Sequence, residues 1–256
     1  MNTFNTVAAI FVVAGFVSAI IIACDLTRRK QSMKIMNSVW ILTGLWASVL
    51  GLWAYFKFGR TGKIKGNSMA GMKMDGTNNS MADMDMKPAS MKEMDGMKGM
   101  KMDMRPVRPK WQSVTLSTLH CGAGCTLADI IGETFMLFFP VVIAGSALIG
   151  GWVFDYILAL AIGVFFQFAA IRAMEKIPFG TAISRAFKAD VLSLTAWQVG
   201  MYGWMAIAIF GFFHGSPLPK LSWSFWFMMQ VAMLCGFICA YPVNIMLIKA
   251  GIKKGM

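Results

Sequence analysis

The chain has 256 residues, of which 57% are hydrophobic and only 14% are charged, and its net charge is +12. Its apolar residues form long runs instead of the mixed pattern of a soluble domain, so the composition indicates an integral membrane protein. The positive charge lies mainly in loops and tails beside these runs, as is common next to anionic lipid, and no folded basic face for nucleic acid is visible. We therefore expect membrane lipid, and no nucleic acid, as a partner.

Six apolar runs are long enough to cross a bilayer, because about 20 helical residues cover a hydrocarbon core of roughly 30 Å. They are Thr3 to Cys24, Asn37 to Phe58, Ser117 to Ala144, Trp152 to Met174, Val191 to Phe213 and Trp223 to Ile248. The predicted fold class is all-α, a polytopic transmembrane helix bundle of about six spans. The domains that follow are a two-helix transmembrane hairpin over residues 1–58, a loop over 59–110 and a four-helix module over 111–256.

The distribution of Lys and Arg predicts the orientation in the membrane. Cytoplasmic loops carry an excess of these residues, and the loop counts favour an orientation with both termini in the cytoplasm. The basic segment from Arg28 to Lys34 opposes this orientation. The first run has no Lys or Arg ahead of it, so we expect an uncleaved helix instead of a signal peptide.

Residues 67–104, the Met-rich loop, hold half of the chain's 24 methionines and no aromatic or branched aliphatic residue. Such a segment cannot bury enough apolar surface to fold, so we expect it to be disordered. Thioethers are soft, neutral ligands that select Cu(I) or Ag(I). The predicted ligands in its closely spaced second half are Met91, Met94, Met97, Met100, Met102 and Met104. A contact surface for other proteins and compositional drift are the alternatives.

The third apolar run contains the motif HCGAGC. On a helix, Cys121 and Cys125 lie one turn apart on the same face, and Asp129 and Met136 continue that stripe. The stripe is a polar track inside a membrane helix, where ionisable residues are costly and usually functional. We predict that the two thiols are metal ligands.

Other roles for the two thiols stay open. A redox disulfide needs Cβ atoms about 3.8 Å apart, which a regular helix does not provide at this spacing, although Gly122 and Gly124 permit unwinding. The thiols could also serve only as small packing residues. His120 points about 100° away from its neighbour Cys121, so it joins a metal site only where the helix is unwound.

The last two runs carry further soft ligands at helical spacing. These candidate metal ligands are Met201 and Met205 in the fifth run, with Met229, Met233, Cys235 and Cys239 in the sixth. Ordinary packing is the competing interpretation of each pair. Pro242 and Asn244 predict an interruption of the sixth helix, because proline lacks the N–H group that the helix needs.

Three segments carry a family resemblance: HCGAGCTLADIIGE, KADVLSLTAWQVGMYGWMA and QVAMLCGFICAYPVNIMLIKAGIKKGM. Over roughly Trp111 to Met256 the chain resembles a bacterial integral-membrane family, domain of unknown function 4396. The resemblance implies a four-span membrane module and implies little about its chemistry. The Met-rich loop is similar in composition to methionine segments of copper resistance proteins and of copper importers of the Ctr type.

These patterns predict a Cu(I)-binding membrane protein, a transporter or channel that captures the ion on the loop and passes it along the Cys and Met sites. No Walker motif is present, so we do not expect an ATP-driven pump. The leading hypothesis is a transporter and not an enzyme. A membrane thiol oxidoreductase that uses Cys121 and Cys125 is one alternative, and a non-transporting copper sensor or scaffold is another. A copper chaperone or other copper-handling protein is an expected partner, and homo-oligomers stay open.

Overall fold

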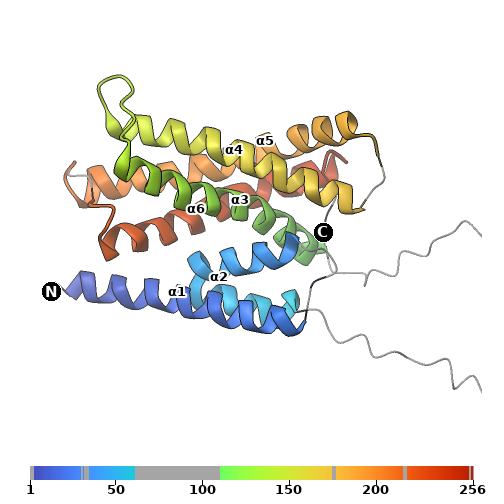
Figure 1. Ribbon diagram of the computed structural model, residues 1–256, viewed down its shortest axis with the longest axis horizontal. Coiled ribbons are helices and arrows are strands. Elements are labelled where there is room, and N and C mark those ends of the chain that lie inside the picture. The colour runs from blue at the N-terminus through green and yellow to red at the C-terminus, as the bar shows by residue number, and fades with distance from the viewer. Residues whose placement is uncertain are drawn as a thin grey trace, which may run out of the picture. The chain divides into compact units, whose positions relative to one another are not determined.

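The computed structural model describes residues 3–29, 31, 35–60, 110–174, 177–215, 218–253 and 255. The predicted all-α fold class is confirmed, because these ranges contain helices and no strand (Figure 1). In chain order the elements are α1 (Thr3–Arg28), α2 (Ile35–Ala54), the π-helical η1 (Tyr55–Gly59), α3 (Lys110–Phe138), α4 (Ala147–Met174), α5 (Phe179–Ala206), the π-helical η3 (Ile207–Phe212) and α6 (Trp223–Lys249).

Five helical segments are long and apolar enough to cross a membrane, namely α1, α2 with η1, α3, α4 and α6 of the described chain. Helix α5 is not among them, because its first half carries Arg185, Lys188 and Asp190 and its second half contains polar residues such as Gln198 that lower its hydropathy. Its apolar residues begin at Val191 and continue past its end into η3. The predicted fifth span therefore corresponds to the second half of α5 together with η3.

The chain reverses direction inside α2. Ser48 has φ 50° and ψ −126°, far from helical values. On either side of it, the rings of Trp40 and Tyr55 lie 5.4 Å apart, whereas a continuous helix would separate residues this far apart in sequence by about 22 Å. Gly59 also packs directly on the Trp40 ring. Residues 35–59 therefore form a helical hairpin, which we call the α2 hairpin.

The α2 hairpin returns the chain to the end of α1 from which it started. Arg60 Nη2 donates to Asp25 Oδ1 at 2.7 Å, and Gln31 Nε2 donates to the Gly59 carbonyl at 2.8 Å. The single straight span predicted over Asn37 to Phe58 is therefore corrected: length and hydropathy fit a span, but a turn at its middle folds the segment on itself.

Contacts define one end of the helix bundle, which we call the Arg60 end. The Phe58 ring, next to Arg60 in the chain, packs against Trp111 at the start of α3 with centroids 5.5 Å apart. The tail that follows α6 lies here as well, because Gly255 packs directly against Ser113 of α3. The α2 hairpin, the start of α3 and the C-terminal tail therefore share this end.

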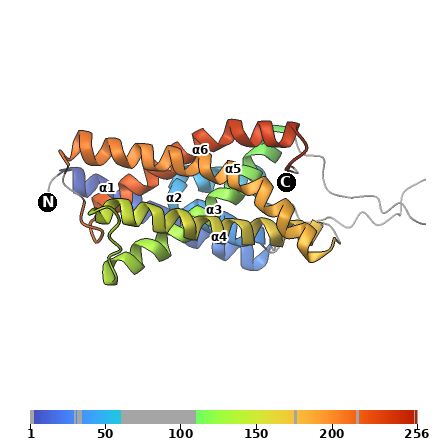
Figure 2. The same ribbon diagram turned by 90° about the horizontal axis from the view of Figure 1, so that it is seen from above.

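The opposite end, which we call the Lys220 end, holds the start of α1 and the start of α6. Ser224 of α6 donates a short hydrogen bond to Asn5 of α1. Lys220, just before α6, forms an ion pair with Glu133 in the last turns of α3. Helix α1 thus begins at one end of the bundle and α6 finishes at the other (Figures 1 and 2).

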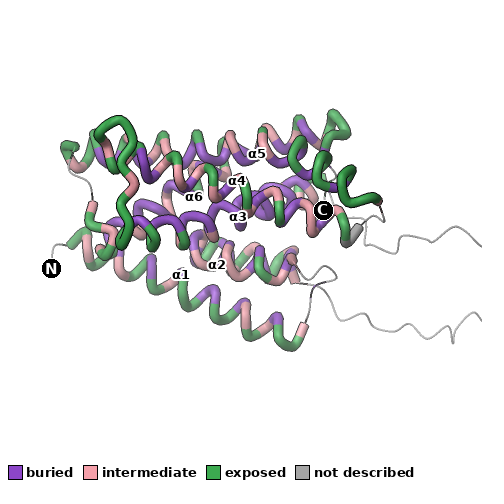
Figure 3. Tube along the Cα trace, turned by 45° about the horizontal axis from the view of Figure 1, so that its top comes forward, coloured by how far each residue is buried: buried purple, intermediate pink, exposed green. Residues whose placement is uncertain are grey.

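Helix α3 lies at the centre of the packing. In its most apolar stretch 61% of the residues are buried, against 28–44% in the other four candidate spans, and Figure 3 shows it as the most continuously buried element. Glycines allow this enclosure. Gly122 packs against the Trp197 ring of α5, and a Cβ at Gly124 would lie 3.0 Å from Gly163 of α4. The polar stripe of α3 therefore faces protein and not lipid.

Candidate functional site

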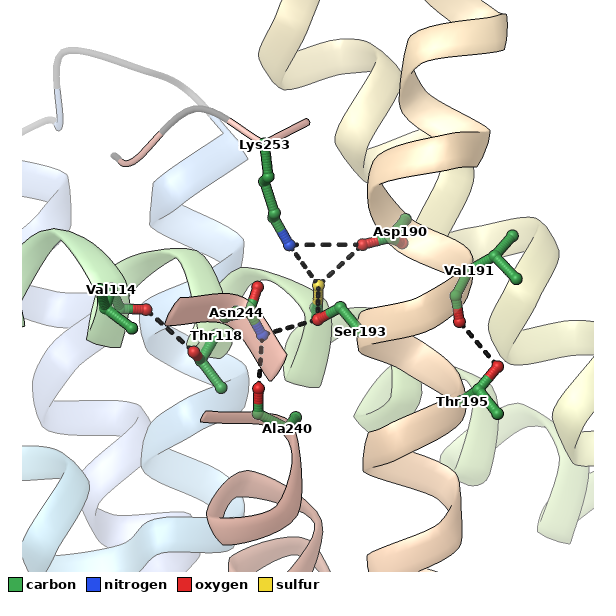
Figure 4. Close-up of polar contacts among 10 residues, drawn as sticks. Val114, Thr118, Asp190, Val191, Ser193, Thr195, Ala240, Asn244 and Lys253 are labelled. Atoms are coloured by element: carbon green, nitrogen blue, oxygen red, sulfur yellow. Dashed lines mark hydrogen bonds and ion pairs between the residues drawn. The ribbon is translucent and has the colours of Figure 1, made fainter. Parts of the chain in front are cut away.

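Five buried polar side chains meet near the Arg60 end, and we call them the Cys121 cluster. The Cys121 thiol donates to Asp190 Oδ1 at 2.7 Å, and Lys253 Nζ donates to the Cys121 sulfur at 2.8 Å. Ser193 Oγ donates to the same sulfur at 3.2 Å and accepts from Asn244 Nδ2 at 2.7 Å. Helices α3, α5 and α6 and the C-terminal tail each contribute to this network (Figure 4).

A turn at the end of α6 brings Lys253 into the bundle. The backbone N–H groups of Ile252 and Lys253 both donate to the Leu247 carbonyl, at 3.0 and 3.2 Å. This arrangement needs a left-handed residue after the helix, and Gly251 supplies it with φ +70°. The tail therefore turns back across the end of the helix, and the Lys253 ammonium enters between α3 and α5.

The cluster pairs one fully buried cation with one fully buried acid. Lys253 Nζ lies 3.7 Å from Asp190 Oδ1, and both side chains are 0% exposed. Burial by itself disfavours the ammonium, but Cys121 and Asp190 more than offset this effect and raise the pKa of Lys253 above its ordinary value. The Lys253 side chain is therefore a permanent cation at physiological pH.

The Asn244 side chain connects α6 to α5 by a hydrogen bond in this cluster. Besides its bond to Ser193, its Nδ2 donates to the Ala240 carbonyl at 2.9 Å. Pro242 lies inside α6, which nevertheless remains helical from Trp223 to Lys249. The predicted interruption of the sixth helix is therefore not observed.

A second site surrounds Asp129, two turns along α3 from Cys121. Asp129 is 3% exposed, and neither carboxylate oxygen has a hydrogen-bond partner among the described residues. It lines a cavity of about 400 Å³ together with Met229, Met233 and Gln230 of α6 and Trp46 of the α2 hairpin. This volume is within the usual range of ligand pockets. The cavity thus joins a carboxylate without partners to two thioethers.

More acidic groups lie next to Asp129 toward the Lys220 end. Glu133 and Asp155 are close enough to interact with Asp129 electrostatically. Asp155 of α4 packs directly on Gly132, where a Cβ would collide with its carboxylate. Lys220 supplies one ammonium, to Glu133. The group therefore holds three acids beside this one ammonium.

The other predicted ligands on α3 and α5 are buried. Met201, Met205 and Cys125 belong to the hydrophobic core, with exposures of 1%, 5% and 0%. Met136 is also buried, and its sulfur accepts a hydrogen bond from the Val141 backbone at 3.4 Å. All four side chains therefore lie inside the bundle, where they are available either for packing or as ligands.

The remaining predicted ligands do not join either site. Cys239 is exposed and Cys235 half-buried, and neither lines the Asp129 cavity. His120 is buried within a regular part of α3, with its ring 6.0 Å from that of Phe166. No three His, Cys, Asp or Glu side chains of the described ranges come close enough to hold a metal ion. The methionines predicted in the Met-rich loop lie outside the described residues.

With this geometry in place, the comparison with known families can be added. Residues 110–253 match the family described as Domain of unknown function (DUF4396), which is more than half of the chain. The chain belongs to the DUF4396 family. No curated protein and no solved structure matches it. The DUF4396 domain contains the whole Cys121 cluster, with Lys253 as its last matched residue, whereas α1 and the α2 hairpin lie before it.

Of the Cys121 cluster, the sequence predicted only Cys121 as a site residue, and Asp190, Ser193, Asn244 and Lys253 were missed. Lys253 belongs to a basic tail, which the sequence presents as a membrane-flanking charge. Asp190 precedes an apolar run and looks like an interfacial residue. A glycine two residues before Lys253 was the available signal, since a glycine after a helix often turns the chain back.

Proposed function

We propose that this DUF4396 protein is a membrane transporter for the soft monovalent cation Cu(I), with Ag(I) as its analogue. The observation that carries the proposal is Asp129, which is buried without a hydrogen-bond partner in the described chain and lines a cavity shared with Met229 and Met233. An unpaired carboxylate is costly inside a membrane and is typical of ion paths. The two thioethers favour Cu(I) over hard cations such as Mg²⁺.

The stripe on α3 supports passage through the bundle. Cys121, Cys125, Asp129 and Glu133 follow one another at four-residue intervals on this helix. With a rise of 1.5 Å per residue, they cover about 18 Å, more than half of a hydrocarbon core of roughly 30 Å. Soft and acidic groups therefore follow α3 from near the Arg60 end toward the Lys220 end.

The Met-rich loop would supply the ion. The loop is joined to the bundle through Arg60 on one side and Lys110 on the other, and both residues lie at the Arg60 end. Thioethers that are joined to the bundle through these two residues would deliver Cu(I) to the Cys121 cluster. The same end is where a copper chaperone or another copper-handling protein would deliver the ion.

The α2 hairpin bears on orientation. Because it returns to its own side, α1 and α3 to α6 make five passages, and Arg28 and Arg29 at the end of α1 lie on the same side as Arg60. Among the described Lys and Arg residues, Lys220 alone lies at the Lys220 end, and the Arg60 end has Arg28, Arg29, Lys57, Arg60, Lys110, Arg172, Arg185, Lys188, Lys249 and Lys253. The excess of Lys and Arg at the Arg60 end favours a cytoplasmic location for this end in the bacterial inner membrane. The start of α1 would then lie outside, in place of the cytoplasmic N-terminus predicted from loop counts.

Ag(I) uptake into liposomes tests the proposal. Purified full-length protein is expected to transport Ag(I), and the double substitution Cys121→Ser with Cys125→Ser is expected to lower the initial rate at least tenfold. Cys24→Ser is the matched control, because Cys24 is an exposed thiol on α1. Binding of Ag(I) without any uptake by the wild type would reject transport and favour the sensor or scaffold.

One observation favours a thiol oxidoreductase as a second candidate. Reactive cysteines often lie beside a basic residue, and Lys253 contacts the Cys121 sulfur at 2.8 Å. Oxidation of Cys121 and Cys125 to a disulfide would release two electrons and two protons, which a membrane quinone could accept. Diagonal electrophoresis after incubation with a quinone distinguishes this candidate, because a transporter would keep both thiols reduced.

A further inference from the structure

The Cys121 cluster contains two buried side-chain oxygens without a hydrogen-bond partner among the described residues. Asp190 and Asn244 are both 0% exposed. Asp190 Oδ2 and Asn244 Oδ1 have no hydrogen-bond partner in the described part of the chain. The Cys121 sulfur lies 2.8 Å and Asp190 Oδ1 3.7 Å from Lys253 Nζ. Ser193 and Asn244 continue the same network from this sulfur (Figure 4). The ammonium thus occupies a site that is built for a cation.

Lys253 differs from the other members of the cluster in its attachment. Cys121, Asp190, Ser193 and Asn244 lie on long helices, whereas Lys253 lies on the tail after α6. The turn at Gly251 and two backbone bonds to the Leu247 carbonyl hold this tail in place. Lys253 can therefore leave the cluster without a change in the helix packing.

We propose that the Cys121 cluster is a binding site for a soft monovalent cation, and that Lys253 is a tethered cation which occupies this site until Cu(I) or Ag(I) displaces it. The identity of the displacing ion rests on the proposed function. A monovalent ion replaces the ammonium without a change in the buried charge, whereas a divalent ion would add an unbalanced charge. The thiol sulfur makes the site soft.

Displacement of Lys253 by the ion would release the C-terminal tail and open the Cys121 cluster to water. When the ion binds the Cys121 sulfur, the thiol proton passes to Asp190, which already accepts its hydrogen bond, and the Lys253 ammonium moves into water at the Arg60 end. The ion is then one helical turn from Cys125 and two turns from Asp129. In the absence of the ion, the docked tail keeps the site closed without leaving a buried carboxylate unpaired.

Chemical labelling of the Lys253 amine tests the displacement on the wild-type chain. Purified full-length protein is treated with an N-hydroxysuccinimide acetate reagent, with and without Ag(I), and modified lysines are quantified by peptide mass spectrometry. We expect Ag(I) to raise the modification rate of Lys253 at least tenfold. Exposed Lys249, four residues earlier, is the internal control and should not change. In Cys121→Ser, Ag(I) should have no effect on Lys253.

Gly251→Ala tests the tether without a change in the site itself. The φ of +70° at this position is unfavourable for alanine, although nothing lies within 4 Å of the added Cβ. The strain should favour the undocked tail and raise metal-free labelling of Lys253 roughly 5- to 30-fold. Gly180→Ala, which also meets no neighbour within 4 Å but has no positive φ, is the matched control.

The outcomes separate this inference from the proposed function. Rapid metal-free labelling of Lys253 in the wild type, or labelling that saturating Ag(I) does not increase, would overturn the tethered-cation site. Ag(I)-dependent labelling without Ag(I) uptake into liposomes would support the site and reject the transporter. Uptake without Ag(I)-dependent labelling would support the transporter and overturn the site.

Discussion

Removal of the Lys253 charge should strongly destabilise the protein, because its partner cannot reach water. At the 3.7 Å separation of Lys253 Nζ and Asp190 Oδ1, two unit charges attract each other by about 4.5 kcal/mol at an effective dielectric constant of 20. In Lys253→Met the buried carboxylate loses this attraction and is left without a cation, which is the costly way to break a buried ion pair. We therefore expect a loss of about 3 to 4 kcal/mol in the free energy of unfolding.

Titration of the protein in mixed micelles with sodium dodecyl sulfate measures this loss. Lys249→Met is the control, since Lys249 is exposed, and its unfolding free energy should be near that of the wild type. The double variant Lys253→Met with Asp190→Asn should regain more than half of the loss, because a neutral amide needs no cation.

Two results would refute this reasoning. One is an unfolding free energy for Lys253→Met within about 0.5 kcal/mol of the wild type, the range of ordinary surface substitutions. The other is a double variant no more stable than Lys253→Met, which would show that the loss comes from packing of the side chain and not from its charge.

Three further predictions concern packing, the loop and the hairpin. Gly122→Ala should lower the free energy of unfolding by about 1 to 3 kcal/mol, because its Cβ would strike the buried Trp197 ring. Gly203→Ala is the control, since its Cβ would meet nothing within 4 Å. Equal losses in the two variants would contradict the packing of Gly122 on Trp197. Replacement of every Met in the Met-rich loop by Leu should lower the Cu(I) stoichiometry without changing the thermal unfolding midpoint, and an unchanged stoichiometry would reject capture by the loop. In oriented membranes an impermeant maleimide should label Thr27→Cys and Lys57→Cys from the same side, whereas labelling from opposite sides would exclude the α2 hairpin.

Helix positions were largely predictable from hydropathy, because lipid requires long apolar helices. The sixth run was predicted from Trp223 to Ile248 and α6 covers Trp223–Lys249; the first was predicted from Thr3 and α1 begins there. The turn in α2 was not predictable in this way. Ser48 is neither Gly nor Pro, and its neighbours are apolar, so the sequence around the reversal is the same as in a straight span.

The candidate sites were predictable only where a single helix carries them. The stripe from Cys121 to Asp129 follows from helical spacing alone, and burial confirms that it faces the protein interior. Which side chains from other helices meet this stripe depends on tertiary packing. The pairing of Cys121 with Asp190, 69 positions later, and with Lys253, 132 positions later, has no periodic signal in the sequence.

The most direct test of the transport claim is the initial rate of Ag(I) uptake into liposomes that contain wild-type protein, Asp129→Asn or Asp25→Asn. Asp25 is the matched control, because it is a partly buried acid that pairs with Arg60 and does not line the Asp129 cavity. We predict uptake by the wild type and by Asp25→Asn, and a rate at least tenfold lower in Asp129→Asn. Uptake by Asp129→Asn at the wild-type rate, or no uptake by the wild type, would contradict the account.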